Sequence, residues 1–203
     1  MKISSSDVEV PPSSVSVYDA IFRRRNVKEF TGEPVSRGTL DRLFSAAIWA
    51  PNHRLTEPTR FFAVPHDSSM RQRLAEAAWQ SAYDEAANPS PEQKRRSADG
   101  KRDRVLNAPA MVYVYSLDGD DDEITRENYA TACCAVQNMA LAAVAEGLCL
   151  DWSTGGLTRI PGLAGMLGAD DAWTMVGVLL LGKAAALPTA ERTPHSEVVT
   201  WLE

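Results

Sequence analysis

The order of its elements predicts that this chain has an α+β fold built as a three-layer α/β/α domain. Helical patterns come first, and two nearly continuous apolar stretches that are typical of buried strands follow, separated by further helical patterns. The 203 residues show neither a repeat of fixed period nor a change in composition that marks a second domain. We therefore expect one domain over residues 15–203, behind a loose arm over residues 1–14 that is rich in serine and proline.

Two helices and a strand are expected at the start of this domain. Residues 18–25 carry apolar side chains on neighbouring helical turns. The next helix begins at Ser36, a typical N-cap residue, repeats apolar residues at helical spacing and ends before Pro51. The β-prone stretch over residues 60–64 predicts a short strand.

The middle of the chain predicts two helices and a central strand. A helix is expected over residues 70–87, and the polar segment 88–104 favours a second one, either a solvated surface helix or a lid over a cleft. Residues 110–117 are nearly all apolar, β-branched or aromatic, which predicts a strand covered on both faces. The acidic run 118–123 does not place glycine at the sixth and glutamate at the twelfth position that a calcium loop requires, so we expect a solvated turn.

The helix predicted over residues 127–146 is the most informative element of the second half. Its residues are small on every face, and Gly147 follows as a typical C′ residue. A helix of this kind is buried, either in a core or against a partner subunit. The elements expected after it are a strand over 148–152, a loop over 153–156, a short helix over 160–167, a buried strand over 173–181 and a terminal strand over 198–202.

Composition and missing motifs argue against several classes of function. A net charge of −6 disfavours nucleic-acid binding, and the longest apolar run, residues 175–181, is too short to span a membrane. The sequence contains no Rossmann, P-loop or nucleophile-elbow motif. Its three cysteines and three histidines lack metal-ligand spacing, so we predict no metal site and expect reduced thiols in a cytoplasmic protein.

One basic cluster remains as a candidate binding site. Seventeen of the 21 basic residues lie in the first 105 positions. Arg23, Arg24 and Arg25 are consecutive, and Asn26 and Lys28 follow closely. Guanidinium groups present a planar fork of donors that matches phosphate oxygens. The cluster therefore indicates a phosphate site, with a solvated basic helix end as the alternative.

Five motifs in the same order resemble those of the nitroreductase family of flavin enzymes. They are IFRRRNVKEF at residues 21–30 with Pro34-Val35 behind it, Ala50-Pro51-Asn52-His53, the helix end Gly147-Leu148, the loop Trp152-Ser153-Thr154-Gly155, and the strand 178–183 that ends in Leu-Gly-Lys. The Ala-Pro-Asn-His motif and the terminal aromatic stretch are most similar to the short, minimal branch of the family. The resemblance covers about residues 17–202.

The resemblance implies an FMN enzyme that works as a homodimer with each flavin at the interface. It implies a mixed, largely antiparallel sheet flanked by helices, with the C-terminal strand exchanged between subunits. It also implies hydride transfer from NADH or NADPH through flavin N5 to a nitroaromatic, a quinone or a similar small-molecule acceptor, by a ping-pong mechanism without a fixed catalytic side chain. The alternatives are a family offshoot with dehydrogenase, dehalogenase or flavin-cleaving activity, and a flavin-binding protein with little turnover.

The same resemblance assigns the residues that bind the cofactor. The residues that match those holding the FMN phosphate and ribityl chain are Arg24, Arg25, Asn26 and Lys28. Those that match residues reaching FMN from the partner subunit are Asn52 and His53. Those that match the loop beside the flavin ring are Trp152, Ser153, Thr154 and Gly155. Arg23 falls outside the pattern and is expected only to cap its helix.

Three residues depart from the family pattern. Leu55 stands where many members have asparagine, Glu57 where they have glutamine and Thr59 where they have tryptophan. A carboxylate near the flavin disfavours its anionic reduced form, so Glu57 either slows hydride transfer or pairs with an arginine such as Arg54 or Arg60.

Overall fold

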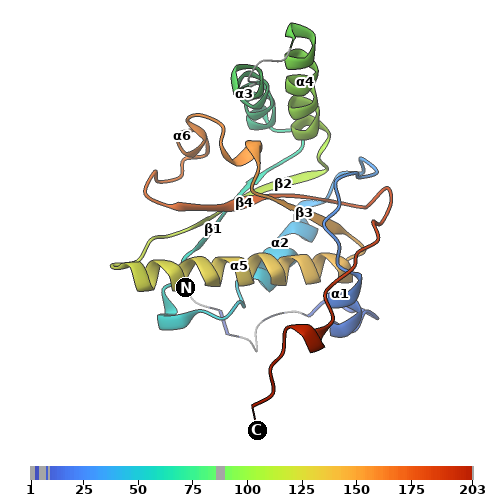
Figure 1. The fold of residues 1–203 in the computed structure, drawn as a ribbon, viewed down its shortest axis with the longest axis vertical. Coiled ribbons are helices and arrows are strands. Elements are labelled where there is room, and N and C mark those ends of the chain that lie inside the picture. Colours follow the sequence, from blue (N-terminus) through green and yellow to red (C-terminus); the bar gives the residue numbers. More distant parts are fainter. Residues whose placement is uncertain (1–2, 5–7, 9, 86–89, 203) are drawn as a thin grey trace.

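A four-stranded sheet runs through the middle of the molecule, with helices on both of its faces (Figure 1). The computed structural model describes residues 3–4, 8, 10–85 and 90–202. Its strands are β1 (Thr59–Val64), β2 (Ala110–Ser116), β3 (Cys149–Ser153) and β4 (Thr174–Gly182), in the spatial order β1-β2-β4-β3. All neighbouring strands are antiparallel, and an isolated bridge between Asn26 and Leu150 adds a parallel contact. The predicted α+β class is confirmed.

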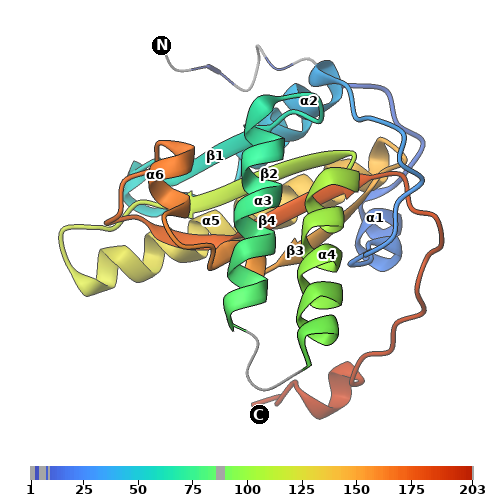
Figure 2. The same ribbon diagram turned by 90° about the horizontal axis from the view of Figure 1, so that it is seen from above.

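The helices form an outer layer on each face of the sheet (Figures 1 and 2). One layer contains α1 (Val17–Arg23), α2 (Arg37–Ala47) and α5 (Asp122–Ala145). The other contains α3 (Ser69–Glu85), α4 (Pro91–Asn107) and α6 (Leu163–Leu167). The short 3-10 helices are η2 (His53–Leu55), η3 (Gly156–Thr158) and η4 (His195–Glu197). Among the described residues, no helix is long and apolar enough to cross a membrane.

The central strand β2 separates two hydrophobic cores. Every residue of β2 is buried, as its continuous apolar sequence predicts. Because side chains alternate along a strand, Ala110, Val112 and Val114 pack with α2 and α5, whereas Met111 and Tyr113 pack with α3 and α4. The sheet is therefore covered on both faces by these two cores.

A bulge in β4 brings the backbone close to Trp152. The pairing register shifts between Val114 and Tyr115 of β2, which leaves Val176 as an extra residue on β4. A Cβ atom at Gly177 would lie 2.3 Å from the indole nitrogen of Trp152, so only glycine fits there without displacing the ring. The indole N–H donates to the Val176 carbonyl at 3.1 Å, and the bulge thus orients Trp152.

The long helix α5 begins earlier than its sequence predicts. The acidic run 118–123 was expected to be a solvated turn; residues 118–120 do lie outside the helix, whereas Asp121 is the N-cap and Asp122 and Glu123 are in the first turn of α5. The Asp121 carboxylate accepts the Ile124 backbone N–H at 2.8 Å, and Glu123 adds negative charge at the positive end of the helix dipole. Gly147 has a φ of +73°, as expected for a C′ residue.

The polar segment over residues 88–104 is largely helical, as predicted, although residues 88–89 lie outside the described residues. Ser90 and Gln93 form a capping box at the start of α4. Ala98 and Val105 are buried where α4 packs against α3, so one face of this helix belongs to the domain.

A buried arginine fastens the α3–α4 pair to the sheet. The Arg71 side chain is 1% exposed, and its guanidinium donates to the carbonyls of Val105 at 2.8 Å, Ala108 at 3.1 Å and Val64 at 2.8 Å. Two of these carbonyls lie at the C-terminal end of α4, where helix carbonyls lack partners within the helix. One side chain thus joins α3, α4 and the end of β1.

The predicted terminal strand over residues 198–202 is wrong for the single chain. These residues follow η4, are exposed, and run away from the sheet past α1 (Figure 1). A strand requires a hydrogen-bonded neighbour, and among the described residues none pairs with this segment.

Candidate functional site

The arginines behind α1 have different surroundings. Arg23 lies in the last turn and pairs with Asp19 at 3.1 Å, which neutralises its charge within the helix. Arg24 is the C-cap residue, so the helix predicted over residues 18–25 ends at Arg23. Among the described residues, no carboxylate forms an ion pair with Arg24 or Lys28. These two cations are therefore available to an anion from outside the chain.

Arg25 points to backbone carbonyls. Its guanidinium donates to the carbonyls of Phe22 at 2.7 Å, Arg24 at 2.9 Å and Pro188 at 3.2 Å. Arg25 therefore joins the end of α1 to the C-terminal segment, a role that the phosphate prediction does not include.

Asn26 connects this basic segment to β3. Its amide nitrogen donates to Asp151 at 2.5 Å, and its amide oxygen accepts the Trp152 backbone N–H at 2.7 Å. The Val27 backbone N–H donates to the Leu150 carbonyl at 3.3 Å. The structure thus brings together the basic segment and the loop that begins at Trp152, two regions about 125 residues apart in the chain.

Asp151 is a site residue that the sequence interpretation missed. It is 1% exposed, accepts from Asn26 on one carboxylate oxygen and forms an ion pair with Arg104 of α4 on the other. A buried carboxylate needs such partners, because burying an unpaired charge is costly. The sequence feature that could have identified Asp151 is its position as the one charged residue in the otherwise apolar predicted strand 148–152. The sequence does not indicate which residues pair with it.

The loop after β3 is held by short-range hydrogen bonds. The Gly155 backbone N–H donates to the Ser153 hydroxyl at 3.4 Å, and the Gly155 carbonyl accepts the Thr158 hydroxyl at 2.9 Å. The Thr154 carbonyl accepts a guanidinium N–H of Arg159 at 3.4 Å. The loop therefore has a defined shape beside Asn26, as expected for one that contacts a bound molecule.

The segment after α2 has unusual backbone geometry. Arg54, Leu55 and Glu57 all have positive φ values, at 59°, 54° and 49°, which non-glycine residues rarely adopt. The Asn52 amide oxygen accepts the Thr56 hydroxyl at 3.3 Å and the Glu57 backbone N–H at 3.4 Å, which stabilises the turn. Strained conformations of this kind cluster at binding sites, so the segment is a candidate for contact with a ligand.

His53 and Arg54 are anchored to the first turns of α5. His53 Nδ1 lies 2.9 Å and Arg54 Nε lies 3.0 Å from the Glu127 carboxylate, and Arg54 also pairs with Glu123 at 3.0 Å. Desolvation acts to raise the pKa of Glu127, but the hydrogen bonds from Arg54 and His53 outweigh it and lower that pKa. The sequence suggested Arg54 as a partner of Glu57, but in the structure Arg54 pairs with Glu123 and Glu127.

Asn52 and His53 lie far from the basic segment of the same chain. They sit beside the N-terminal turns of α5, whereas the basic segment lies beside Leu150, just beyond the C-terminal end of that helix (Figure 1). A helix of 24 residues is about 36 Å long. One chain therefore does not bring the two predicted groups together.

A comparison with protein-family models identifies the group to which the chain is related. The model named "Nitroreductase: Nitroreductase family" matches residues 21–183. The chain belongs to the nitroreductase family.

Individual relatives agree with membership of the nitroreductase family. A Bacillus subtilis (strain 168) protein named "Putative NAD(P)H nitroreductase YfhC" is 25% identical over 178 residues, or 87% of this chain and 89% of that protein. The crystal structure of a nitroreductase-like family protein from Bacillus cereus has a TM-score of 0.80 and 29% identity, and covers 96% of this chain and 100% of its own. The FMN- and NADPH-dependent nitroreductase NfnB of a Sphingopyxis strain, at 20% identity and a TM-score of 0.70 over 93% of this chain and 99% of its own, shares the fold.

This nitroreductase-family chain exposes apolar surface on the layer that contains α5. We predicted that α5 is buried either in a core or against a partner subunit; within the single chain one side of α5 packs in the core, and Tyr129, Ala130 and Cys134 on the other side are exposed. Large apolar side chains are also exposed on the neighbouring elements of this layer. They are Val17, Tyr18, Ile21, Phe22, Ile48, Trp49 and Leu55. Exposed apolar side chains that gather on one layer of a domain are typical of a subunit interface.

The ion pairs of Glu127 predict a pH-dependent contribution to stability. Because folding lowers the pKa of Glu127, its contribution is present above the ordinary value of 4.5 and is lost as the pH falls through the lower, folded-state value. Wild type is expected to melt at a higher temperature than Glu127→Gln at neutral pH, and this difference should disappear in more acidic solution. Melting curves followed by circular dichroism measure it, and a difference that does not change with pH contradicts the assignment.

Proposed function

We propose that this chain is an FMN-dependent oxidoreductase that uses NADH or NADPH to reduce a nitroaromatic, a quinone or a similar small molecule by a ping-pong mechanism. The chemistry that bound FMN supplies is acceptance of a hydride at N5 and delivery of two electrons to the second substrate. The observation that carries the proposal is that Arg24 and Lys28, cations without a described ion-pair partner, lie within two residues of Asn26, whose side chain accepts the backbone N–H of Trp152 at the start of the loop 152–155.

The donor set fits a phosphate monoester. Arg24 and Lys28 supply positive charge, and Asn26 fixes their segment against β3 through both ends of its amide. Trp152 is held by the β4 bulge, and the backbone of the following loop lies next to it. Arg24 and Lys28 would hold the phosphate, and Trp152 with the loop behind it would hold one edge of the flavin ring. Because these groups are already in position, less conformational entropy is lost on binding.

We also propose that the site is completed in a homodimer. Asn52 and His53 are too far from Arg24 to share one cofactor within a chain, so they would act on the FMN held by the other subunit. The exposed apolar layer around α5 supplies a surface for that interface. The exposed C-terminal segment would then pair with the free edge of β1 in the partner, as an exchanged strand. We expect this dimer to act in the cytoplasm.

Replacing Arg24 tests the phosphate assignment. Arg24→Ala is expected to weaken FMN binding by about 1.5–3 kcal/mol, the usual range for a hydrogen bond to a charged group, which is roughly a ten- to hundredfold rise in Kd. Quenching of FMN fluorescence on titration measures the affinity. Arg23→Ala is the matched control, since Arg23 pairs within α1 at an exposed position. Equal effects of the two substitutions would refute the role of Arg24.

A flavin-binding protein with little turnover, or an offshoot with another redox reaction, is the second candidate. Leu55, Glu57 and Thr59 motivate it, because all three depart from the family pattern and Leu55 is exposed. Arg60 donates to the backbone carbonyl of Glu57 at 2.8 Å. Anaerobic mixing with NADH or NADPH separates the candidates, since reduction of the flavin supports the oxidoreductase and bound flavin that stays oxidised supports the alternative.

A further inference from the structure

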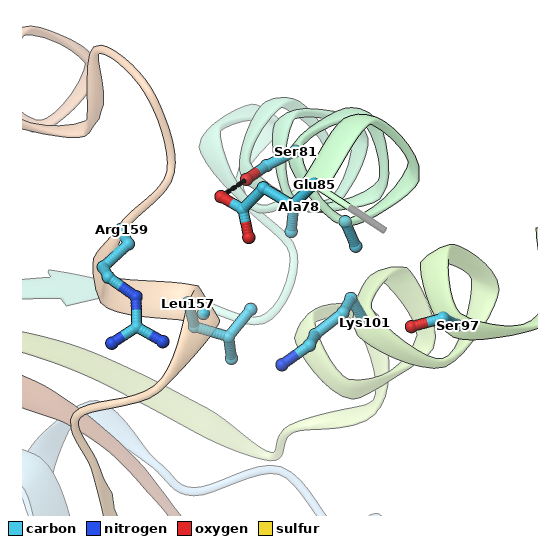
Figure 3. Close-up of a pocket in the computed structure, with 9 residues that line it drawn as sticks. Ala78, Ser81, Glu85, Ser97, Lys101, Leu157 and Arg159 are labelled. Carbon is cyan, nitrogen blue, oxygen red and sulfur yellow. Dashed lines mark hydrogen bonds between the residues drawn. The ribbon is translucent and has the colours of Figure 1, made fainter. Parts of the chain in front are cut away.

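A cavity of about 230 Å³ lies between α3, α4 and η3 (Figure 3). Its lining combines the apolar side chain of Leu157 with the charged ends of Glu85, Lys101 and Arg159. This volume is below the roughly 300–1,000 Å³ of complete small-molecule sites but holds several waters at ~30 Å³ each. The cavity therefore fits one end of a ligand, of about the size of a benzoate ion.

Two cationic residues, Lys101 and Arg159, line this cavity (Figure 3). The Lys101 ammonium lies so close to Gly156 that a Cβ atom there would be 3.1 Å from Nζ. The Arg159 guanidinium donates to the Thr154 carbonyl at 3.4 Å. Among the residues that the structure describes, neither cation forms an ion pair with a carboxylate.

A single carboxylate in the lining leaves an excess of positive charge. Glu85 lines the same space, and one of its oxygens accepts the Ser81 hydroxyl at 3.0 Å. Two cations thus share this lining with one anion, and of these three groups Lys101 is partly buried whereas Glu85 and Arg159 are exposed. An anionic group that enters from outside would balance the second cation and accept hydrogen bonds from both.

The cavity adjoins the proposed cofactor site. It begins at Gly156, the residue after the loop 152–155 that we propose lies beside the flavin. A molecule with its acidic group between Lys101 and Arg159 would therefore extend towards that loop. We propose that this cavity binds the carboxylate of the electron acceptor, which makes aromatic acids the preferred substrate class; this inference rests on the proposed oxidoreductase function.

Equilibrium binding of benzoate to the purified protein with its flavin tests the cavity directly, because benzoate has no reducible group. Isothermal titration calorimetry should show binding that is at least about tenfold weaker in Lys101→Met and in Arg159→Met. Arg95→Met, which removes one positive charge from an exposed position on α4, should bind as wild type does. Neutral benzamide should bind weakly and equally to all four proteins.

Several results overturn the inference. The inference is wrong if benzoate does not bind, or if it binds equally to all variants. It is also wrong if inorganic phosphate competes with benzoate at equal concentration, because this indicates a general anion site.

A kinetic experiment compares 4-nitrobenzoate with 4-nitrobenzamide as electron acceptors. The ratio of their kcat/KM values, which measures the preference for the acid, should fall about tenfold in Lys101→Met. A protein that binds benzoate but never FMN contradicts the proposed function, whereas one that is reduced by NADH but ignores benzoate contradicts only this inference.

Discussion

Asp151→Ala is expected to lower the free energy of unfolding by about 3 kcal/mol, the lower end of the range for breaking a buried ion pair. The Asp151 side chain is 2% exposed, whereas that of Arg104 is 29% exposed and regains some contact with water when its partner is removed. The substitution also removes the acceptor for the Asn26 amide. We therefore expect weaker FMN binding together with the loss of stability.

Urea unfolding of the two proteins measures this effect. Glu92→Ala is a suitable control, because Glu92 pairs with Arg96 on the exposed surface of α4 and such pairs contribute about 0–1 kcal/mol. The double substitution Asp151→Ala with Arg104→Met should recover part of the loss, since it no longer leaves the partly buried charge of Arg104 without a partner. A loss for Asp151→Ala no larger than that of the control would show that the pair is not a structural element.

Arg71→Met is expected to lower the free energy of unfolding by about 2–5 kcal/mol. Desolvation lowers the pKa of Arg71 to about 10, so burial has a real cost, yet the guanidinium remains charged at neutral pH. Its three hydrogen bonds to carbonyls involve a charged donor and contribute roughly 1.5–3 kcal/mol each, which outweighs that cost. Methionine preserves most of the volume and supplies none of these donors.

The control for Arg71 lies on the same helix. Arg73 is exposed, so Arg73→Met is expected to change the free energy of unfolding by no more than about 0.5 kcal/mol. Thermal and urea unfolding of both variants decide the matter. If Arg71→Met is as stable as Arg73→Met, relief of the buried charge compensates for the lost hydrogen bonds.

Sequence patterns predicted most of the helices and strands, because helix caps and buried strands depend mainly on residues that are neighbours in the chain. The continuous apolar runs correctly predicted β2 and β4, and the Ser36 N-cap and the Gly147 C′ residue correctly predicted helix ends. The acidic run before α5 was assigned to a turn because its charge suggests solvent. In the structure, residues 118–120 do lie outside the helix, but Asp121, Asp122 and Glu123 stabilise the positive end of its dipole.

Contacts between distant segments could not be predicted. Asp151 of β3 contacts Asn26 of the basic segment and Arg104 of α4, and only the folded sheet brings these three residues together. The terminal strand failed for the same reason, since residues 198–202 have strand propensity but no neighbour within the described chain. The roles of Arg24, Lys28 and the loop 152–155 towards FMN remain predictions, and the structure supports them through the position of these residues.

The most direct test of the proposed function is the absorbance spectrum of the purified protein after incubation with FMN and removal of unbound flavin. We predict a yellow protein that retains about one FMN per chain, since each subunit carries one basic segment and one loop at residues 152–155. Anaerobic addition of NADH or NADPH should bleach this colour, and a nitroaromatic or a quinone should restore it. A colourless protein that retains no FMN would contradict the account.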